Sequence, residues 1–218
     1  MNSELLNRIL TSIILLPILL YATIYSGYFL VFLLLICYAL SVYEIIKNSK
    51  NISFIFFSSS LLFFSFYCFY FLRGNTDYSL IIFLWILSST FFSDIGGYIF
   101  GRIFKGKKLT KISPNKTYSG AIGSIVLSCL SLPFMNQLQF YFFKENLINF
   151  LELNFLIITI FISIVCQLGD LLVSFLKRRV NIKNTSNILP GHGGIIDRID
   201  GLIFVLVFCF LLKLLSLI

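Results

Sequence analysis

The sequence predicts an all-α fold, a polytopic transmembrane helical bundle of about seven spans. Of the 218 residues, 58% are hydrophobic and only 12% are charged, which is about half the charged share of a soluble domain. Apolar stretches of about 20 residues recur along the chain, and each is long enough to cross a bilayer as a helix. These stretches lack the strict polar–apolar alternation of membrane barrel strands.

Seven apolar segments are predicted to span the membrane. Their approximate bounds are residues 9–25, 28–46, 53–72, 78–101, 119–135, 153–176 and 199–217. Only Ser26 and Gly27 separate the first two segments, so a tight helical hairpin is expected there. Residues 138–150 are aromatic but are interrupted by Lys144 and Glu145. A short helix at the membrane interface, rather than a further span, is expected for them.

The basic residues predict the orientation of these spans. With seven spans, 14 of the 17 Lys and Arg residues fall on one side of the membrane. Loops rich in Lys and Arg stay in the cytoplasm. The N-terminus and the two long polar loops, 102–118 and 177–198, are therefore predicted to be cytoplasmic. The net charge of +8 is explained by this topology, and no nucleic-acid partner is expected.

Two carboxylates lie inside predicted spans, about two helical turns from the cytoplasmic end. They are Asp94 in the fourth span and Asp170 in the sixth. A charged group in a span costs a few kcal/mol, so each is expected to face a cation, a metal ion or a water-filled cavity. An ion pair with a lysine is the structural alternative. Glu44, near the end of the second span, either belongs to such a site or snorkels or pairs with Lys47.

Spacing along two helices predicts that polar groups converge. Asp170, Ser174 and Lys177 are four and three residues apart, and Asp197 and Asp200 are three residues apart, so each set shares a helix face. Carboxylates that meet at one membrane depth repel one another unless a cation lies between them. Oxygen ligands without clustered thiols or imidazoles favour Mg²⁺ or Mn²⁺ over zinc.

The second polar loop has features suited to an anionic ligand. Four cations crowd this region, namely Lys177, Arg178, Lys183 and Arg198, and arginine forks suit phosphate oxygens. Gly191, Gly193 and Gly194 allow backbone amides to approach a ligand, next to a predicted helix start where the dipole favours anions. His192, the only histidine, is interpreted as a phosphate contact or a proton carrier, with a backbone-satisfied turn residue as the alternative.

The first polar loop repeats this chemistry with Ser113, Lys116 and Thr117 around a turn-forming proline. A solvated basic loop, retained for topology alone, is the alternative for this segment.

These motifs resemble the phosphatidate cytidylyltransferase (CDP-diacylglycerol synthase) family. The family pattern reads Ser-x-x-Lys-Arg, then Lys-Asp, then Pro-Gly-His-Gly-Gly-x-x-Asp-Arg-x-Asp. The matching residues are Ser174, Lys177, Arg178, Lys183, Pro190, Gly191, His192, Gly193, Gly194, Asp197, Arg198 and Asp200. Shorter matches surround Asp94, Lys116 and Asp170. The chain departs from the pattern at Asn184, where the family usually has Asp, and at Ser119, where it usually has Glu.

The resemblance implies nucleotidyl transfer from CTP to phosphatidate, which gives CDP-diacylglycerol and pyrophosphate in phospholipid biosynthesis. The implied catalytic residues are Asp170, Asp197, Asp200, Lys177 and His192. The three aspartates are also the implied ligands of one or two Mg²⁺ ions. The implied substrate-binding residues are Asp94, Ser113, Lys116, Thr117, Ser174, Arg178, Lys183, Gly193, Gly194 and Arg198.

On this interpretation, residues 1–77 form N-terminal transmembrane helices and residues 78–218 form the catalytic domain. The expected partners are phosphatidate, CTP and the lipid bilayer, and the resemblance also implies a homodimer. The expected location is the inner (cytoplasmic) membrane of a bacterium, with the active-site cavity near the cytoplasmic face. Two other functions fit the same residues. One is a CTP-dependent polyprenol or phytol kinase, which would release CDP, and the other is an anion transporter.

Overall fold

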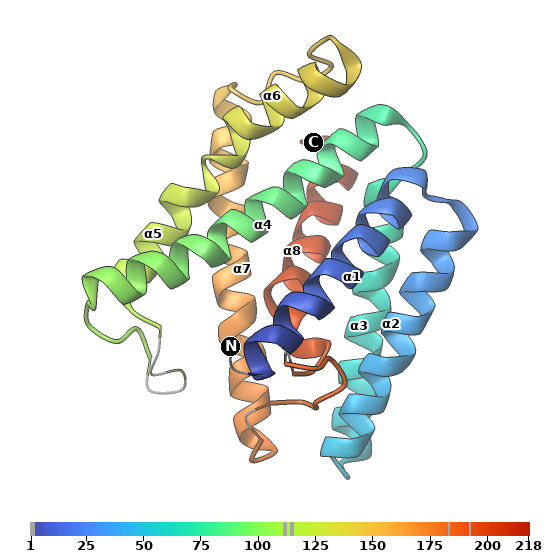
Figure 1. Cartoon of the computed structure of the whole chain (residues 1–218), viewed down its shortest axis with the longest axis vertical. Coiled ribbons are helices and arrows are strands. Elements are labelled where there is room, and N and C mark those ends of the chain that lie inside the picture. The colour runs from blue at the N-terminus through green and yellow to red at the C-terminus, as the bar shows by residue number, and fades with distance from the viewer. Residues whose placement is uncertain (1–2, 111–112, 114–115, 183, 192) are drawn as a thin grey trace.

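A computed structural model describes residues 3–110, 113, 116–182, 184–191 and 193–218 (Figure 1). Its helices are α1 (Ser3–Tyr25), α2 (Gly27–Asn48), α3 (Ile52–Arg73), α4 (Asp77–Phe104), α5 (Tyr118–Ser128), α6 (Ser131–Phe143), α7 (Leu153–Arg179) and α8 (Ile196–Leu214). Within these described ranges, the only β-type pairing is two isolated bridges. The predicted all-α fold is therefore confirmed.

Five helical segments among the described residues are long and apolar enough to cross a membrane. They are α2, α3, α4, the α5–α6 pair taken together, and α7. The described side chains of α1 begin at Leu10, and Leu10–Tyr25 is a shorter apolar helix. The remaining helix, α8, begins with the charged residues Asp197, Arg198 and Asp200. Six of the seven predicted segments thus correspond to single helices, and the chain has the apolar helices of an integral membrane protein.

The fifth predicted span differs from the expectation because it is two helices. The chain turns at Cys129 and Leu130, and helix resumes at Ser131. Pro133 explains the break, because its ring has no N–H to donate and collides with the carbonyl four residues earlier, that of Cys129.

The prediction of a separate interfacial helix at residues 138–150 is also wrong. Its first residues instead complete α6, which ends at Phe143. The segment that follows is folded back by Gln139. The side-chain Nε2 of Gln139 donates to the Ile148 carbonyl at 2.5 Å, and its Oε1 accepts from the Ile148 amide at 3.1 Å. A buried side chain thus organises a stretch that lacks helical periodicity.

The end of α7 and the start of α8 lie at one end of the molecule. In Figure 1 they lie low in the view with the start of α1, whereas the C-terminus lies high. At the high end, the buried Arg73 of α3 fixes the last turn of α1. Its guanidinium donates to the carbonyls of Thr23 and Ile24, which satisfies two groups that a helix end leaves without partners.

Helices α4 and α5 approach each other through glycines. A Cβ atom on Gly96 would lie 2.3 Å from the Gly123 carbonyl oxygen, and one on Gly120 would lie 2.8 Å from the Gly97 carbonyl oxygen. Small residues of this kind allow two membrane helices to pack backbone against backbone. The glycine contact fixes two walls of the cavity described below.

Candidate active site

A cavity of about 180 Å³ opens between α4, α5, α7 and the segment that precedes α5. Its polar lining includes Asp94, Lys116, Thr117, Gln167 and Asp170. The Lys116 Nζ lies 3.1 Å from Asp170 Oδ2, and Asp94 Oδ1 accepts from the Cys166 thiol at 3.6 Å. We refer to Asp94, Lys116 and Asp170 as the cavity cluster. Asp94 and Asp170 therefore line one cavity, as expected, and Lys116 is paired with Asp170.

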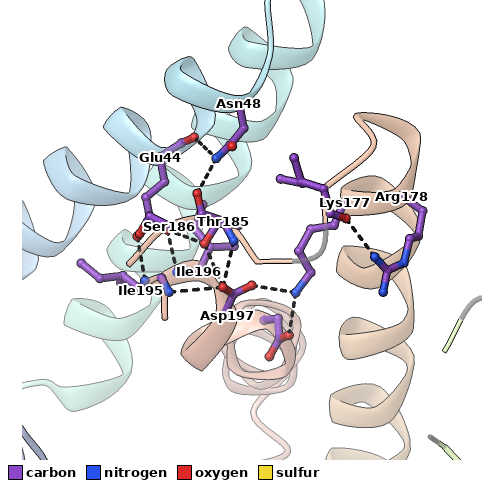
Figure 2. Close-up of polar contacts among 12 residues, drawn as sticks. Glu44, Asn48, Lys177, Arg178, Thr185, Ser186, Ile195, Ile196 and Asp197 are labelled. Atoms are coloured by element: carbon purple, nitrogen blue, oxygen red, sulfur yellow. Dashed lines mark hydrogen bonds and ion pairs between the residues drawn. The ribbon is translucent and has the colours of Figure 1, made fainter. Parts of the chain in front are cut away.

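A second polar group lies where the loop after α7 meets the start of α8 (Figure 2). Asp197 Oδ1 accepts from Lys177 Nζ at 2.8 Å. Its other oxygen accepts from the backbone amides of Thr185 at 2.9 Å and Gly194 at 3.2 Å. We refer to Glu44, Lys177, Thr185, Ser186 and Asp197 as the loop cluster. The side chains of Lys177 and Asp197 are only 13% and 10% exposed, so this ion pair is largely shielded from solvent.

Lys177 and Asp200 connect the two clusters. The Lys177 Nζ lies 3.7 Å from Asp200 Oδ2, and the Asp200 carboxyl is close enough to Asp170 for the two charges to interact. The absence of a side chain at Gly201 makes this approach of α7 and α8 feasible, because a Cβ there would lie 2.6 Å from Asp170 Oδ1. Lys116, Asp170, Asp200, Lys177 and Asp197 thus form one continuous row of charged groups.

Glu44 is the functional candidate whose role sequence reasoning missed. It does not follow the snorkelling alternative, because it is 0% exposed. It accepts from the hydroxyls of Thr185 at 2.9 Å and Ser186 at 2.6 Å, and from the backbone amides of Ile195 and Ile196. The only sequence signal was a carboxylate inside an apolar span. Its partners lie more than 140 residues away, and two of them are backbone groups.

The other predicted residues have more varied surroundings. Thr117 caps α5 by accepting from the Gly120 amide at 3.1 Å, and the carbonyl of Ser113 accepts from the Lys116 amide at 3.1 Å. Ser174 lies on α7 between Asp170 and Lys177. Arg178 is exposed and donates to the Ile182 carbonyl at 3.1 Å.

The glycine turn uses its amides within the protein. The Gly193 amide donates to the Leu189 carbonyl at 3.0 Å, and the Gly194 amide donates to Asp197. The exposed Arg198 lies in the first turn of α8. Two further predicted residues, Lys183 and His192, lie outside the described residues. The substrate contacts of this loop stay predictions.

The loop contacts change the acidity of Asp197. Burial by itself would raise the pKa of this carboxyl. Hydrogen bonds from Lys177 and from the amides of Thr185 and Gly194, with the positive charge of Lys177, outweigh burial and lower the pKa below its ordinary value. Asp197 is therefore a carboxylate whose charge is neutralised by the protein itself.

The neighbouring carboxyls of Asp170 and Asp200 are the best fit to a cation. Two carboxylates in contact repel each other unless a proton or a cation is shared between them, and oxygen pairs of this kind suit Mg²⁺. Asp197 Oδ2 is already taken by two amides. Among the described side chains no group of three or more His, Cys, Asp or Glu residues forms a metal site. The assignment of Asp197 to a metal stays a prediction.

The row of charges and its cavity lie within a region that matches a known family model. The model of the cytidylyltransferase family matches residues 47–215, which is most of the chain. The chain belongs to the cytidylyltransferase family. The match covers every predicted site residue, and Glu44 lies just before its first residue. This membership agrees with the resemblance that the motifs around Asp197 indicated.

Several similar proteins are named phosphatidate cytidylyltransferase. The Staphylococcus haemolyticus protein is 46% identical over 115 residues, which cover 52% of this chain and 42% of that protein. The Bacillus subtilis protein is 39% identical over 149 residues, 66% of this chain and 53% of the relative. The Helicobacter pylori protein is 36% identical over 130 residues, 59% and 45% respectively. The matched part of this cytidylyltransferase family member spans about half the length of these curated relatives.

Proposed function

We propose that the protein transfers the cytidylyl group of CTP to phosphatidate, forming CDP-diacylglycerol and pyrophosphate. A phosphate oxygen of phosphatidate attacks the α-phosphorus of CTP and forms the new P–O–P link. The bond from the α-phosphorus to the oxygen that bridges to the β-phosphorus breaks, and that electron pair leaves with pyrophosphate. The attacking oxygen is already anionic near neutral pH, so the reaction requires positioning and charge stabilisation more than a strong base.

The observation that carries this proposal is the row of charges beside the cavity. Lys116 and Lys177 lie on either side of the Asp170 and Asp200 pair. Two substrates that each carry phosphate charge need cations at fixed positions, and the two lysines supply them at the cavity and at the loop. The names of the related proteins support the same substrates, CTP and phosphatidate.

Mg²⁺ is the proposed cofactor, with Asp170 and Asp200 as the side chains that would hold it. The bound ion would neutralise phosphate charge on the nucleotide and on the leaving pyrophosphate. The protein groups have a separate task. Lys177 orients Asp200 and Asp197, and Lys116 orients Asp170 toward the cavity.

The bilayer is the proposed source of the lipid substrate. The bundle of apolar helices supports entry of the acyl chains from the side, and the concentration of basic residues near the site supports a cytoplasmic orientation. The bacterial relatives support a location in the inner membrane. We also propose that the protein forms a homodimer.

Product analysis with purified protein in lipid nanodiscs tests this function. With phosphatidate, CTP and Mg²⁺, we expect equal amounts of pyrophosphate and CDP-diacylglycerol, and neither product when phosphatidate is left out. Release of CDP together with a phosphorylated lipid alcohol would instead identify a kinase. Flux of CTP or phosphate across sealed vesicles, without any covalent product, would identify a transporter.

A further inference from the structure

We propose that Glu44 is a positioning residue that sets the geometry of Lys177 and Asp197 from outside the catalytic row. The contacts of the loop cluster support this inference structurally. Its activity test rests on the proposed function. Glu44 lies on α2, in the first third of the chain, and points toward the start of α8 (Figure 2). Its two oxygens accept four hydrogen bonds, at 2.6, 2.8, 2.9 and 3.2 Å. That number uses the full accepting capacity of a carboxylate.

Helix α8 needs this carboxylate because its own sequence supplies no side-chain cap at the N-cap position. The residue there is Ile195, and no side-chain hydrogen bond is made from it. The first amides of a helix have no partners within the helix, and they attract negative charge. The amides of Ile195 and Ile196 are buried and both donate to Glu44. A residue from a distant helix therefore performs the capping role.

Thr185 links Glu44 to Asp197, which belongs to the row of charged groups. Its hydroxyl lies 2.9 Å from Glu44 Oε2 and 3.1 Å from Asp197 Oδ2, and its amide donates to the same Asp197 oxygen. Asn48, one turn beyond Glu44 on α2, also holds the Thr185 carbonyl, at 2.6 Å. Since Asp197 binds Lys177 through its other oxygen, a shift of Thr185 moves the lysine that we assign to substrate phosphate.

The turn before α8 is shaped to admit this contact. A Cβ atom on Gly194 would lie 1.8 Å from the Thr185 hydroxyl and within 2.9 Å of both Glu44 oxygens. Any side chain at this position would push the carboxylate away from the helix start. The glycine that we expected to bring backbone amides close to a substrate therefore brings them close to Glu44 and Asp197.

The test compares Glu44→Gln with Ser41→Ala in nanodiscs. Glutamine keeps the shape but places an NH₂ group against donors. Ser41 is one turn earlier on the same helix and equally buried, and its hydroxyl donates only to the Cys37 carbonyl within α2. We expect Glu44→Gln to lower kcat by about 10- to 100-fold, the usual cost of losing a group that orients a catalytic one. The KM for CTP should change by less than about threefold, and Ser41→Ala should match the unmodified protein.

Hydrogen exchange at the amides of residues 185–196 provides a readout that does not depend on activity. Glu44→Gln should speed exchange by about tenfold or more, most strongly at Ile195 and Ile196, since these two amides lose their carboxylate acceptor. Thr185→Val should lower kcat as well, and the double variant should be no worse than about twofold below the poorer single variant, because both act through one path.

Unchanged kcat or unchanged exchange in Glu44→Gln would overturn the proposal, and so would fully additive losses in the double variant. If Glu44→Gln does not fold, the kcat and exchange of Thr185→Val decide alone by the same criteria. If the unmodified protein makes no CDP-diacylglycerol, the proposed function fails. In that case the exchange result still decides whether Glu44 orders the loop.

Discussion

The loop cluster and the cavity cluster use the same chemistry, a lysine beside carboxylates, in opposite surroundings. In the loop cluster, Asp197 and Glu44 are saturated by amides and hydroxyls of the protein, and the side chain of Lys177 is 13% exposed. In the cavity cluster, the side chains of Lys116 and Asp170 are 29% and 24% exposed and border a cavity. The carboxylates of the first arrangement use their accepting capacity within the protein, whereas those of the second border free volume.

Within one row of charges, this difference distinguishes groups that stabilise the backbone from groups that are available to bind a ligand. Groups whose hydrogen-bonding capacity is used internally fix the backbone, because a buried polar group without a partner is costly. Groups next to a cavity keep capacity for a substrate or an ion. We therefore expect substitutions in the loop cluster to affect both stability and activity, and substitutions in the cavity cluster to affect activity almost alone.

The largest expected effect is the loss of activity in Asp170→Asn. Removal of this charge from the proposed cation pair should lower kcat/KM by about 10²- to 10³-fold, the usual cost of a lost electrostatic contact in a reaction centre. The thermal unfolding midpoint in detergent should not fall, because the repulsion between Asp170 and Asp200 is relieved. Asp77→Asn, at the start of α4 and the other end of the molecule, is the control. An Asp170→Asn variant that unfolds early would remove the distinction between the clusters.

The second prediction sets Lys177→Met against Lys116→Met. Removing Lys177 leaves the shielded Asp197 carboxylate without its cation and should lower the free energy of unfolding by about 3 kcal/mol. Removing Lys116, whose pair is more exposed, should cost less than about 1 kcal/mol. Both variants should lose activity. Chemical unfolding in mixed micelles measures the difference, and equal destabilisation would contradict our division of the row.

The third prediction concerns Gly194→Ala, with Gly27→Ala as its control. The new methyl group would overlap the Thr185 hydroxyl, and such overpacking costs about 1–3 kcal/mol. Gly27 has φ of +69° but nothing within 4 Å of the added atom, so its substitution costs only backbone strain of about 1 kcal/mol. Activity should fall only in the Gly194 variant. A Gly194→Ala protein with normal turnover would show that the turn tolerates displacement.

The smallest effect is expected for Cys166→Ala. Its thiol is a weak donor and lies 3.6 Å from Asp94, so the cavity cluster keeps its charges when the thiol is lost. We expect kcat/KM to change by less than about threefold, since a long hydrogen bond from a weak thiol donor contributes under about 1 kcal/mol. Cys209→Ala, another fully buried cysteine, controls for loss of packing. A large change specific to Cys166 would indicate that Asp94 depends on the thiol.

The fold was predictable from sequence because membrane helices are recognised by their length and apolar composition. The first four predicted segments and the sixth agree with α1–α4 and α7 to within a few residues at most boundaries. The break at Cys129 was missed, although Pro133 was visible, because a proline in a membrane helix does not by itself say whether the helix bends or ends. The folded-back segment near Ile148 depends on one amide side chain, which periodicity does not reveal.

The site was predictable where its residues share a helix face. Asp170 and Lys177 on α7, with Asp197 and Asp200 on α8, come together in the structure as their spacing indicated. The pairing of Lys116 with Asp170 joins residues 54 positions apart and needed the three-dimensional structure. The role of Glu44 was less predictable still, because it binds backbone amides. Nearly every residue has one, so the sequence does not show which amides are its partners.

The contact between Glu44 and the start of α8 has a consequence for how the protein is made. Glu44 leaves the ribosome about 150 residues before Ile195 and Ile196, its backbone partners, and a carboxylate is costly inside a span until it is paired. Synthesis proceeds from the N-terminus, so α2 must wait, with its carboxylate still hydrated near the membrane surface, until the last helix arrives. The site is then completed last in folding. In a chain cut short before α8, Glu44 would remain without its backbone partners.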